Sequence, residues 1–142
     1  MQSCLFDTSV YVAALRRGDV RQLTRSWVDA KFPIWLSAVV LEELYAGATQ
    51  PARDLVERLE RDFDRLKRIL VPNLGDWIQA GQVLNRLAAK YGYEKIGQAR
   101  LTNDALIAMS ARRQGIRVIT ANERDFRRLA EFRTFQWEVT TV

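Results

Sequence analysis

The sequence predicts an α/β fold, in which a parallel β-sheet is covered by helices on both faces. Two observations support this. Short, bulky apolar segments alternate with longer amphipathic segments along the 142 residues. Several of the apolar segments also stop at a polar residue that can start a helix. Strands that alternate with helices are typical of parallel sheets, because each helix carries the chain back to the start of the next strand.

The first strand is predicted at Cys4-Leu5-Phe6, and it ends at Asp7. Thr8 and Ser9 then start a helix over residues 8–15. The last residue of a parallel strand lies at the carboxyl edge of the sheet, where open α/β sheets bind ligands. Asp7 is therefore expected to face a cleft. The alternative is that Asp7 only caps the following helix.

The next segments continue the alternation. Asp19 is expected to cap a helix that runs to about Lys31, and residues 34–36 form a short strand. Ser37 caps a further helix that stops at Gly47.

Pro51 opens another helix, a position that tolerates proline. One apolar stripe along residues 51–70 predicts that this helix is solvated on its charged face. Residues 75–91 form the next helix, and residues 92–100 form a loop.

The final third contains two more strands. Thr102 is expected to cap a helix that ends at Gln114, and residues 116–120 form a strand. Asn122 caps a short helix up to Glu131, followed by a last strand over residues 135–139.

Composition excludes several classes of chemistry. The chain has no histidine and one cysteine, Cys4, which lies in a predicted buried strand. A Ser-His-Asp device and a His/Cys zinc site are therefore impossible within this chain. We expect one domain over residues 1–142, without a signal peptide or membrane span, in the reducing cytoplasm. The net charge of +5, concentrated in the second half, suits a polyanionic partner.

Acidic residues recur at comparable places along the chain. Asp7 and the segment 120–125 follow strands that share one edge of the sheet. Asp104 and Asp125 are predicted in the first turns of helices, and Asp104 could simply oppose the helix dipole. Asn122 and Asp125 also have the spacing of a capping box. If the acids cluster, they raise each other's pKa, and a divalent cation relieves the repulsion. All-oxygen ligation selects Mg²⁺ or Mn²⁺.

Four segments resemble the motifs of the PIN-domain family, and in particular of VapC-type toxin ribonucleases. They are Leu5-Phe6-Asp7-Thr8-Ser9, residues 36–47 (Leu-Ser-Ala-Val-Val-Leu-Glu-Glu-Leu-Tyr-Ala-Gly), residues 101–108 (Leu-Thr-Asn-Asp-Ala-Leu-Ile-Ala) and residues 118–126 (Val-Ile-Thr-Ala-Asn-Glu-Arg-Asp-Phe). The resemblance implies a three-layer α/β/α sandwich with a five-stranded parallel sheet, and Mg²⁺- or Mn²⁺-dependent cleavage of RNA. It also implies a homodimer that is inhibited by a small cognate antitoxin.

Matching motif to motif, the resemblance implies four metal-site acids, with Asp7 and Asp104 as metal ligands, and four supporting polar residues. The acids are Asp7, Glu43, Asp104 and Asp125, and the supporting residues are Thr8, Ser9, Thr120 and Asn122.

The chain departs from the family at Ser9, where Asn is common, and at Ala121-Asn122, where many relatives have Asp. Either Asp125 or Asn122 could therefore complete the site. The helical spacing favours Glu43 over Glu42 as the site acid only slightly.

Two alternatives to a nuclease remain open. A PIN-like domain can bind RNA or protein without cutting it. A receiver-type phosphoacceptor usually has adjacent acids after the first strand, whereas Asp7 stands alone. Among the basic residues, Lys95 and Arg100 are the candidates for RNA contacts.

Overall fold

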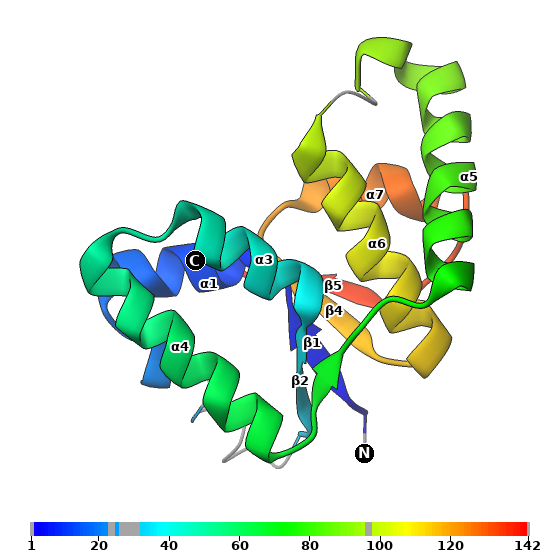
Figure 1. Cartoon of the computed structure of the whole chain (residues 1–142). Coiled ribbons are helices and arrows are strands. Elements are labelled where there is room, and N and C mark those ends of the chain that lie inside the picture. Colours follow the sequence, from blue (N-terminus) through cyan, green and yellow to red (C-terminus); the bar gives the residue numbers. More distant parts are fainter. Residues whose placement is uncertain (1, 23–24, 26–31, 96–97, 142) are drawn as a thin grey trace.

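A five-stranded sheet with the order β3-β2-β1-β4-β5 forms the centre of the computed structural model (Figure 1). Every pair of neighbouring strands is parallel, which confirms the predicted fold class. The structure describes residues 2–22, 25, 32–95 and 98–141. The strands are β1 (Cys4–Phe6), β2 (Ile34–Ser37), β3 (Ile69–Leu70), β4 (Arg117–Thr120) and β5 (Trp137–Val139).

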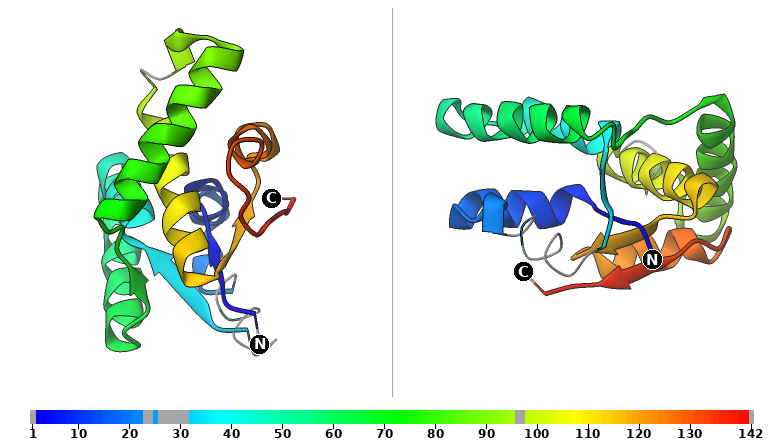
Figure 2. Two further views of the ribbon diagram at one scale, coloured as in Figure 1. Left: turned by 90° about the vertical axis from the view of Figure 1, so that its right-hand side faces the viewer. Right: turned by 90° about the horizontal axis from the view of Figure 1, so that it is seen from below.

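Helices cover both sides of the sheet. In Figure 1, α1, α3 and α4 lie on one side of the strands, and α5, α6 and α7 lie on the other. Helix α5 packs against α6, and the left view of Figure 2 shows the two helices next to each other. The helices are α1 (Thr8–Arg17), α3 (Ala38–Gly47), α4 (Gln50–Arg65), α5 (Leu74–Tyr91), α6 (Ala99–Gln114) and α7 (Glu123–Ala130), with a short 3-10 helix, η1 (Tyr93–Lys95).

The strand order places a switch point between β1 and β4. From β1 the chain proceeds outward to β2 and β3, and it then crosses to β4 and β5 on the other side. The helices that follow β1 and β4 therefore leave the sheet in different directions and open a crevice at its carboxyl edge. Asp7 follows β1 at this crevice, and its backbone N–H donates to the carbonyl of Ile119 in β4 at 2.9 Å.

Burial of the central strands on both faces explains why polar and apolar residues do not alternate along them. All three residues of β1 are buried, and so are three of the four residues of β4. Strands with helices on both faces need apolar side chains on both faces. The ring of Phe6 meets Tyr11 of α1 edge to face, with the ring centres 5.8 Å apart, and fixes the first helix against the sheet.

The helix predicted over residues 51–70 is too long. It ends at Arg65, and Lys67 adopts a left-handed backbone conformation with φ of 56°. Ile69 then pairs with Leu36 as the edge strand β3. Leu66 continues the helical spacing of apolar residues, but its side chain is 55% exposed and does not join the core.

The predicted start of α6 is also wrong. The helix begins at Ala99 after Gln98, so Thr102 lies inside it and does not cap it. Asp104 is consequently in the second turn, where an interaction with the helix dipole has faded. The loop predicted over residues 92–100 is correspondingly shorter and contains η1.

Other boundaries agree with the prediction. The Ser37 hydroxyl accepts from the backbone N–H of Val39 at 3.1 Å, which confirms Ser37 as the cap of α3. Gly115 ends α6 with φ of 66°. The helix expected from Asp19 to Lys31 falls largely on residues 23–24 and 26–31, which lie outside the described residues. In the described part of the chain, no helix is long and apolar enough to cross a membrane.

Candidate active site

Asp7 occupies the position before α1, but its side chain does not cap the helix. Its two carboxylate oxygens instead accept from the Ser9 hydroxyl at 2.6 Å and from the Thr120 hydroxyl at 2.8 Å. The residue is only 2% exposed. The capping alternative is therefore not supported, because the carboxylate is tied to β4 and aimed along the edge of the sheet.

Three of the four predicted acids line one pocket with a volume of about 410 Å³. Asp7 comes from the end of β1, Glu43 from α3 and Asp104 from α6, so segments far apart in the sequence meet here. The complete lining consists of Asp7, Thr8, Ser9, Val12, Ala13, Arg16, Glu43, Arg100, Asp104 and Ala121. We call it the acid pocket.

The two adjacent glutamates of α3 have different surroundings. Glu43 is half-buried and accepts from the Thr8 hydroxyl at 2.7 Å, which ties α3 to α1 at the pocket. Glu42 is exposed and accepts from the Asn103 amide at 3.4 Å, outside the acid pocket. The structure thus separates two residues that helical spacing hardly distinguished.

Asn122 connects Asp104 to the fourth predicted acid, Asp125. Its side-chain amide donates to Asp104 at 3.3 Å and to Asp125 at 3.0 Å. Asn122 precedes α7 but its side chain makes no capping bond, so the capping box is not formed. Asp125 does not line the acid pocket; it is joined to Asp104 through Asn122, and Arg124 contacts its other oxygen at 3.4 Å.

Hydroxyl groups hold the edge of the sheet together. Ser9 donates to Asp7 and also accepts from the backbone N–H of Ala121 at 3.1 Å. Thr120 donates to Asp7 and accepts from the backbone N–H of Asn122 at 2.8 Å. The turn after β4 is therefore fixed relative to Asp7, which leaves little freedom at the base of the pocket.

Burial and mutual repulsion raise the pKa values of the deepest acids. Burial, followed by the charges of Asp7 and Glu43, raises the pKa of Asp104 to about 8. The pKa of Asp7 is raised as well, chiefly by burial, although the hydroxyls of Ser9 and Thr120 oppose the shift. The Arg100 guanidinium favours the charged form of both carboxyls. The pocket therefore holds more negative charge than its surroundings neutralise.

The donor set fits a hard divalent cation in its chemistry. Carboxylate and hydroxyl oxygens are the ligands that Mg²⁺ and Mn²⁺ prefer, and a cation would relieve the repulsion at Asp104. Asp7 and Asp104 are the residues that would hold it, since both are buried and line the acid pocket. Across residues 2–22, 25, 32–95 and 98–141, no three acidic side chains already stand close enough together to form a metal site. Mg²⁺ typically binds through one or two carboxylates and keeps several waters.

Basic residues border the acids. Arg100, predicted from the sequence, lies in the first turn of α6, one turn before Asp104, and lines the acid pocket. Arg16 also lines it and was missed; its spacing of four from Val12 and eight from Thr8 places it on the same face of α1. Lys95 ends η1, but its side chain lies outside the described part of the structure.

Comparison with protein families gives one match that spans most of the chain. A family profile described as the PIN domain matches residues 4–132. A search of curated proteins gives no significant match.

Solved structures with the same fold include VapBC complexes from several bacteria. The DNA-bound VapBC of Salmonella typhimurium aligns with a TM-score of 0.70 and 22% identity over 98% of each chain. VapBC2 of Rickettsia felis, bound to a DNA fragment from its promoter, aligns with a TM-score of 0.67 and 21% identity over 99% of this chain and 100% of that one. VapBC-1 of nontypeable Haemophilus influenzae gives a TM-score of 0.63 and 22% identity over 97% and 98%.

Proposed function

Because this chain belongs to the PIN-domain family, we propose that it is a metal-dependent endoribonuclease and the toxin of a toxin–antitoxin pair. The main support for this proposal is the acid pocket. Asp7, Glu43 and Asp104 line it at the switch point of the sheet. Burial first, and repulsion between the acids second, disfavour the charged form of Asp104, and such perturbed carboxyls are typical of functional sites.

The residues of the pocket suggest a division of roles. Asp7 and Asp104 would hold Mg²⁺ or Mn²⁺, with Ser9 and Thr120 fixing the Asp7 carboxylate. Such an ion activates water and stabilises the charge of a phosphodiester undergoing cleavage. Glu43, oriented by Thr8, would orient or deprotonate that water. Asn122 would position the Asp104 carboxylate through its hydrogen bond, and Asp125 would hold Asn122 in place.

Arg100 and Arg16 are suited to a polyanionic substrate at the same pocket. Both line it, and guanidinium groups bind phosphate oxygens in a bidentate manner. Lys95 remains a predicted RNA contact. We propose RNA as the substrate class because of this basic border and the resemblance to VapC-type ribonucleases.

Cleavage of RNA by the purified protein tests the proposal directly. Total RNA should be cut in Mg²⁺ or Mn²⁺, cutting should stop in EDTA, and either ion in excess over the chelator should restore it. Mapping the new RNA ends would identify the site. Cleavage that persists in excess chelator would rule out the metal-dependent reaction.

One observation favours the alternative of a non-catalytic PIN-like module that binds RNA or protein. The described acids do not already form a three-ligand metal site. Calorimetric titration with Mn²⁺ separates the two proposals, since a nuclease requires Mn²⁺ binding that Asp104→Asn weakens. RNA binding without Mn²⁺ binding or cleavage would support the module.

A second pocket supports an antitoxin partner. It has a volume of about 310 Å³, lies along α1, α3 and the start of α4, and shares Val12, Arg16 and Glu43 with the acid pocket. A partner helix could place apolar side chains here and extend an Arg or Lys to the acids next to it. Several solved structures with the same fold are VapBC structures, and VapBC-5 of Mycobacterium tuberculosis is described as a member of a family of toxin–antitoxin systems. We also propose a homodimer in the cytoplasm, with residues 1–142 as a single domain.

A further inference from the structure

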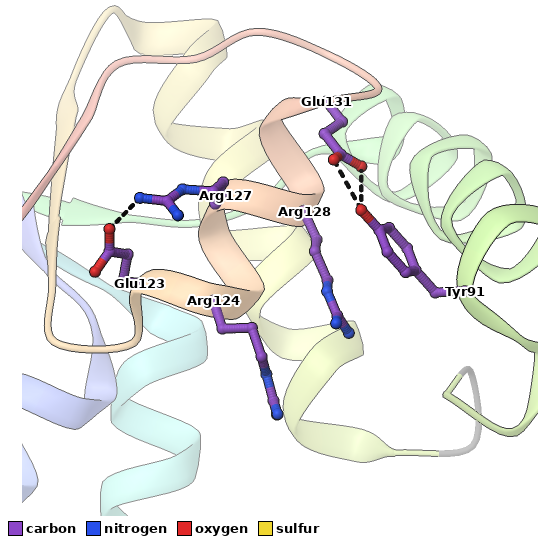
Figure 3. Close-up of a pocket in the computed structure, with 6 residues that line it drawn as sticks. All are labelled: Tyr91, Glu123, Arg124, Arg127, Arg128 and Glu131. Atoms are coloured by element: carbon purple, nitrogen blue, oxygen red, sulfur yellow. Dashed lines mark hydrogen bonds and ion pairs between the residues drawn. The ribbon is translucent and has the colours of Figure 1, made fainter.

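A third pocket, of about 340 Å³, lies outside the acid pocket, between α7 and the end of α5 (Figure 3). Three arginines, two glutamates and a tyrosine line it: Arg124, Arg127, Arg128, Glu123, Glu131 and Tyr91. Figure 3 shows Arg124 and Arg128 extending from α7 the same way, whereas Arg127 turns aside to its partner Glu123. Two guanidinium groups one helical turn apart thus share one face.

Local stability does not explain Arg124. It occupies the second position of α7, and a cation at the start of a helix opposes the helix dipole. Arg124 and Arg128 also stand four residues apart, a spacing at which like charges destabilise a helix. The dipole accounts for Arg127 and Arg128 in the last turn, but it does not account for Arg124. Phosphates bound at Arg124 and Arg128 would offset both costs.

Arg128 packs against the Tyr91 ring, and its charge also acts on the Glu131 carboxylate. Its guanidinium carbon lies 4.3 Å from the centre of the Tyr91 ring, and the Tyr91 hydroxyl donates to the Glu131 carboxylate at 2.8 and 2.9 Å. In the described part of the chain, Arg128 itself forms no ion pair with a carboxylate. Because its position is already fixed, Arg128 would lose little entropy on binding a phosphate.

Contacts join this surface to the acid pocket without a break. Asn122 bridges Asp104 and Asp125, and Arg124 contacts Asp125 at 3.4 Å. The side chain of Arg124 is 71% exposed, so the single contact with Asp125 leaves most of its donors available. A strand with phosphates at Arg124 and Arg128 would therefore approach the acids along α7.

We propose that Arg124 and Arg128, the latter oriented by Tyr91, form a clamp for two phosphates of the RNA strand beside the acid pocket. The clamp rests on the proposed RNA substrate. It deepens that proposal by assigning the surface along which the strand lies. RNA is favoured over an acidic protein segment because this surface continues into the acid pocket, where RNA is the proposed substrate, so that one strand can reach both.

Fluorescence anisotropy with a labelled 20-nucleotide single-stranded RNA in EDTA tests the clamp apart from cleavage. Arg124→Gln with Arg128→Gln should weaken binding about tenfold and make the salt dependence shallower by about 1.4 in log–log slope, for two lost contacts. Tyr91→Leu should weaken binding in the same direction, whereas Tyr91→Phe should keep the ring and the affinity. Arg127→Gln is the matched control, since it removes one positive charge from the same helix and should change affinity by less than about threefold.

Cleavage measured in Mg²⁺ or Mn²⁺ separates the clamp from the proposed function. The double variant should raise KM with kcat largely retained, because the acids are intact. If the wild type cuts RNA but the double variant binds like Arg127→Gln, the clamp is overturned and the nuclease stands. If the wild type binds RNA through the clamp but never cuts, the clamp stands and the nuclease is overturned. Failure of the wild type to bind RNA, or equal competition by polyglutamate, also overturns the clamp.

Discussion

Asp104 of α6 is buried and lies close to other acids, and its charge should govern stability in the absence of metal. Its pKa is raised to about 8 in the folded protein, from the ordinary value of about 4 for Asp. The folded protein therefore binds a proton that the unfolded chain has already released. The stabilisation is complete below about pH 4 and is lost as the pH rises to about 8.

This predicts that the metal-free melting temperature falls as the pH rises from about 4 to about 8, and that Asp104→Asn removes much of the fall. Thermal melts in EDTA across this range would measure both effects. Asp54→Asn is the matched control, because Asp54 is exposed on α4. An unchanged slope in Asp104→Asn would mean that another group causes the pH dependence.

The same residue predicts how metal affinity depends on pH. A metal ion binds the ionised carboxylate, so proton and metal compete for Asp104. At limiting Mn²⁺, binding and RNA cleavage should both increase as the pH rises towards about 8. Saturating Mn²⁺ should shift the rise to lower pH. Titration calorimetry at several pH values would show the competition, and a pH-independent affinity would exclude Asp104 as a ligand.

Glu43 and Glu42 provide a comparison of two neighbouring carboxylates. Glu43 lines the acid pocket and is fixed by Thr8, whereas Glu42 is exposed outside it. Glu43→Gln keeps the size and polarity of the side chain but should reduce kcat by roughly 10²-fold or more, if it acts on water. Glu42→Gln should retain near-normal cleavage. Single-turnover RNA cleavage measures both, and the reverse result would reassign the acid.

At the scale of an element, the start of α7 is organised for the site and not for its own capping. Asn122 donates to Asp104 and Asp125 and makes no side-chain capping bond. The prediction that Asn122 caps this helix is therefore wrong, and any loss of stability in Asn122→Ala has another cause. The loss should instead come from two hydrogen bonds to carboxylates and should raise the pKa of Asp104 further.

Asp125→Asn predicts opposite changes in stability and activity. It removes a negative charge that repels Asp104 and a favourable dipole contact of about 0.3–1 kcal/mol at the start of α7. We expect the metal-free melting temperature to stay level or rise while cleavage falls by at least tenfold. Measuring both on the same preparation is decisive. A lower melting temperature with normal cleavage would make Asp125 structural and leave Asp7, Glu43 and Asp104 as the site.

At the scale of the whole molecule, the proposed toxin predicts an effect on cells. Expression of the chain alone should slow growth, because an unrestrained endoribonuclease depletes RNA. Asp104→Asn is the control, since it should abolish cleavage and leave growth normal at equal expression. Co-expression of a small protein encoded alongside should restore growth by occupying the groove along α1 and α3. Normal growth with the active form would favour a housekeeping nuclease or a binding module.

Much of the fold was determined by the sequence, because its signals are local. Apolar segments that end at polar helix starters located four of the five strands, and Ser37 and Gly115 bounded their helices as expected. Strand β3 could not be located this way. Leu66 and Ile69 continue the helical spacing of α4, and only pairing with Leu36 of β2 makes Ile69 part of a strand.

The sequence by itself determined which chemistry is possible: with no histidine and one buried cysteine, carboxylates had to carry any metal site. It also predicted that Asp7 directly follows the first strand, but it placed Asp104 in the first turn of its helix, whereas Asp104 lies in the second turn of α6. Tertiary structure alone decided that Glu43 rather than Glu42 faces the pocket, that Asn122 bridges two acids instead of capping, and that Arg16 borders the site. These contacts join residues far apart in the chain, and their orientation depends on how α1, α3, α6 and α7 pack around one edge of the sheet.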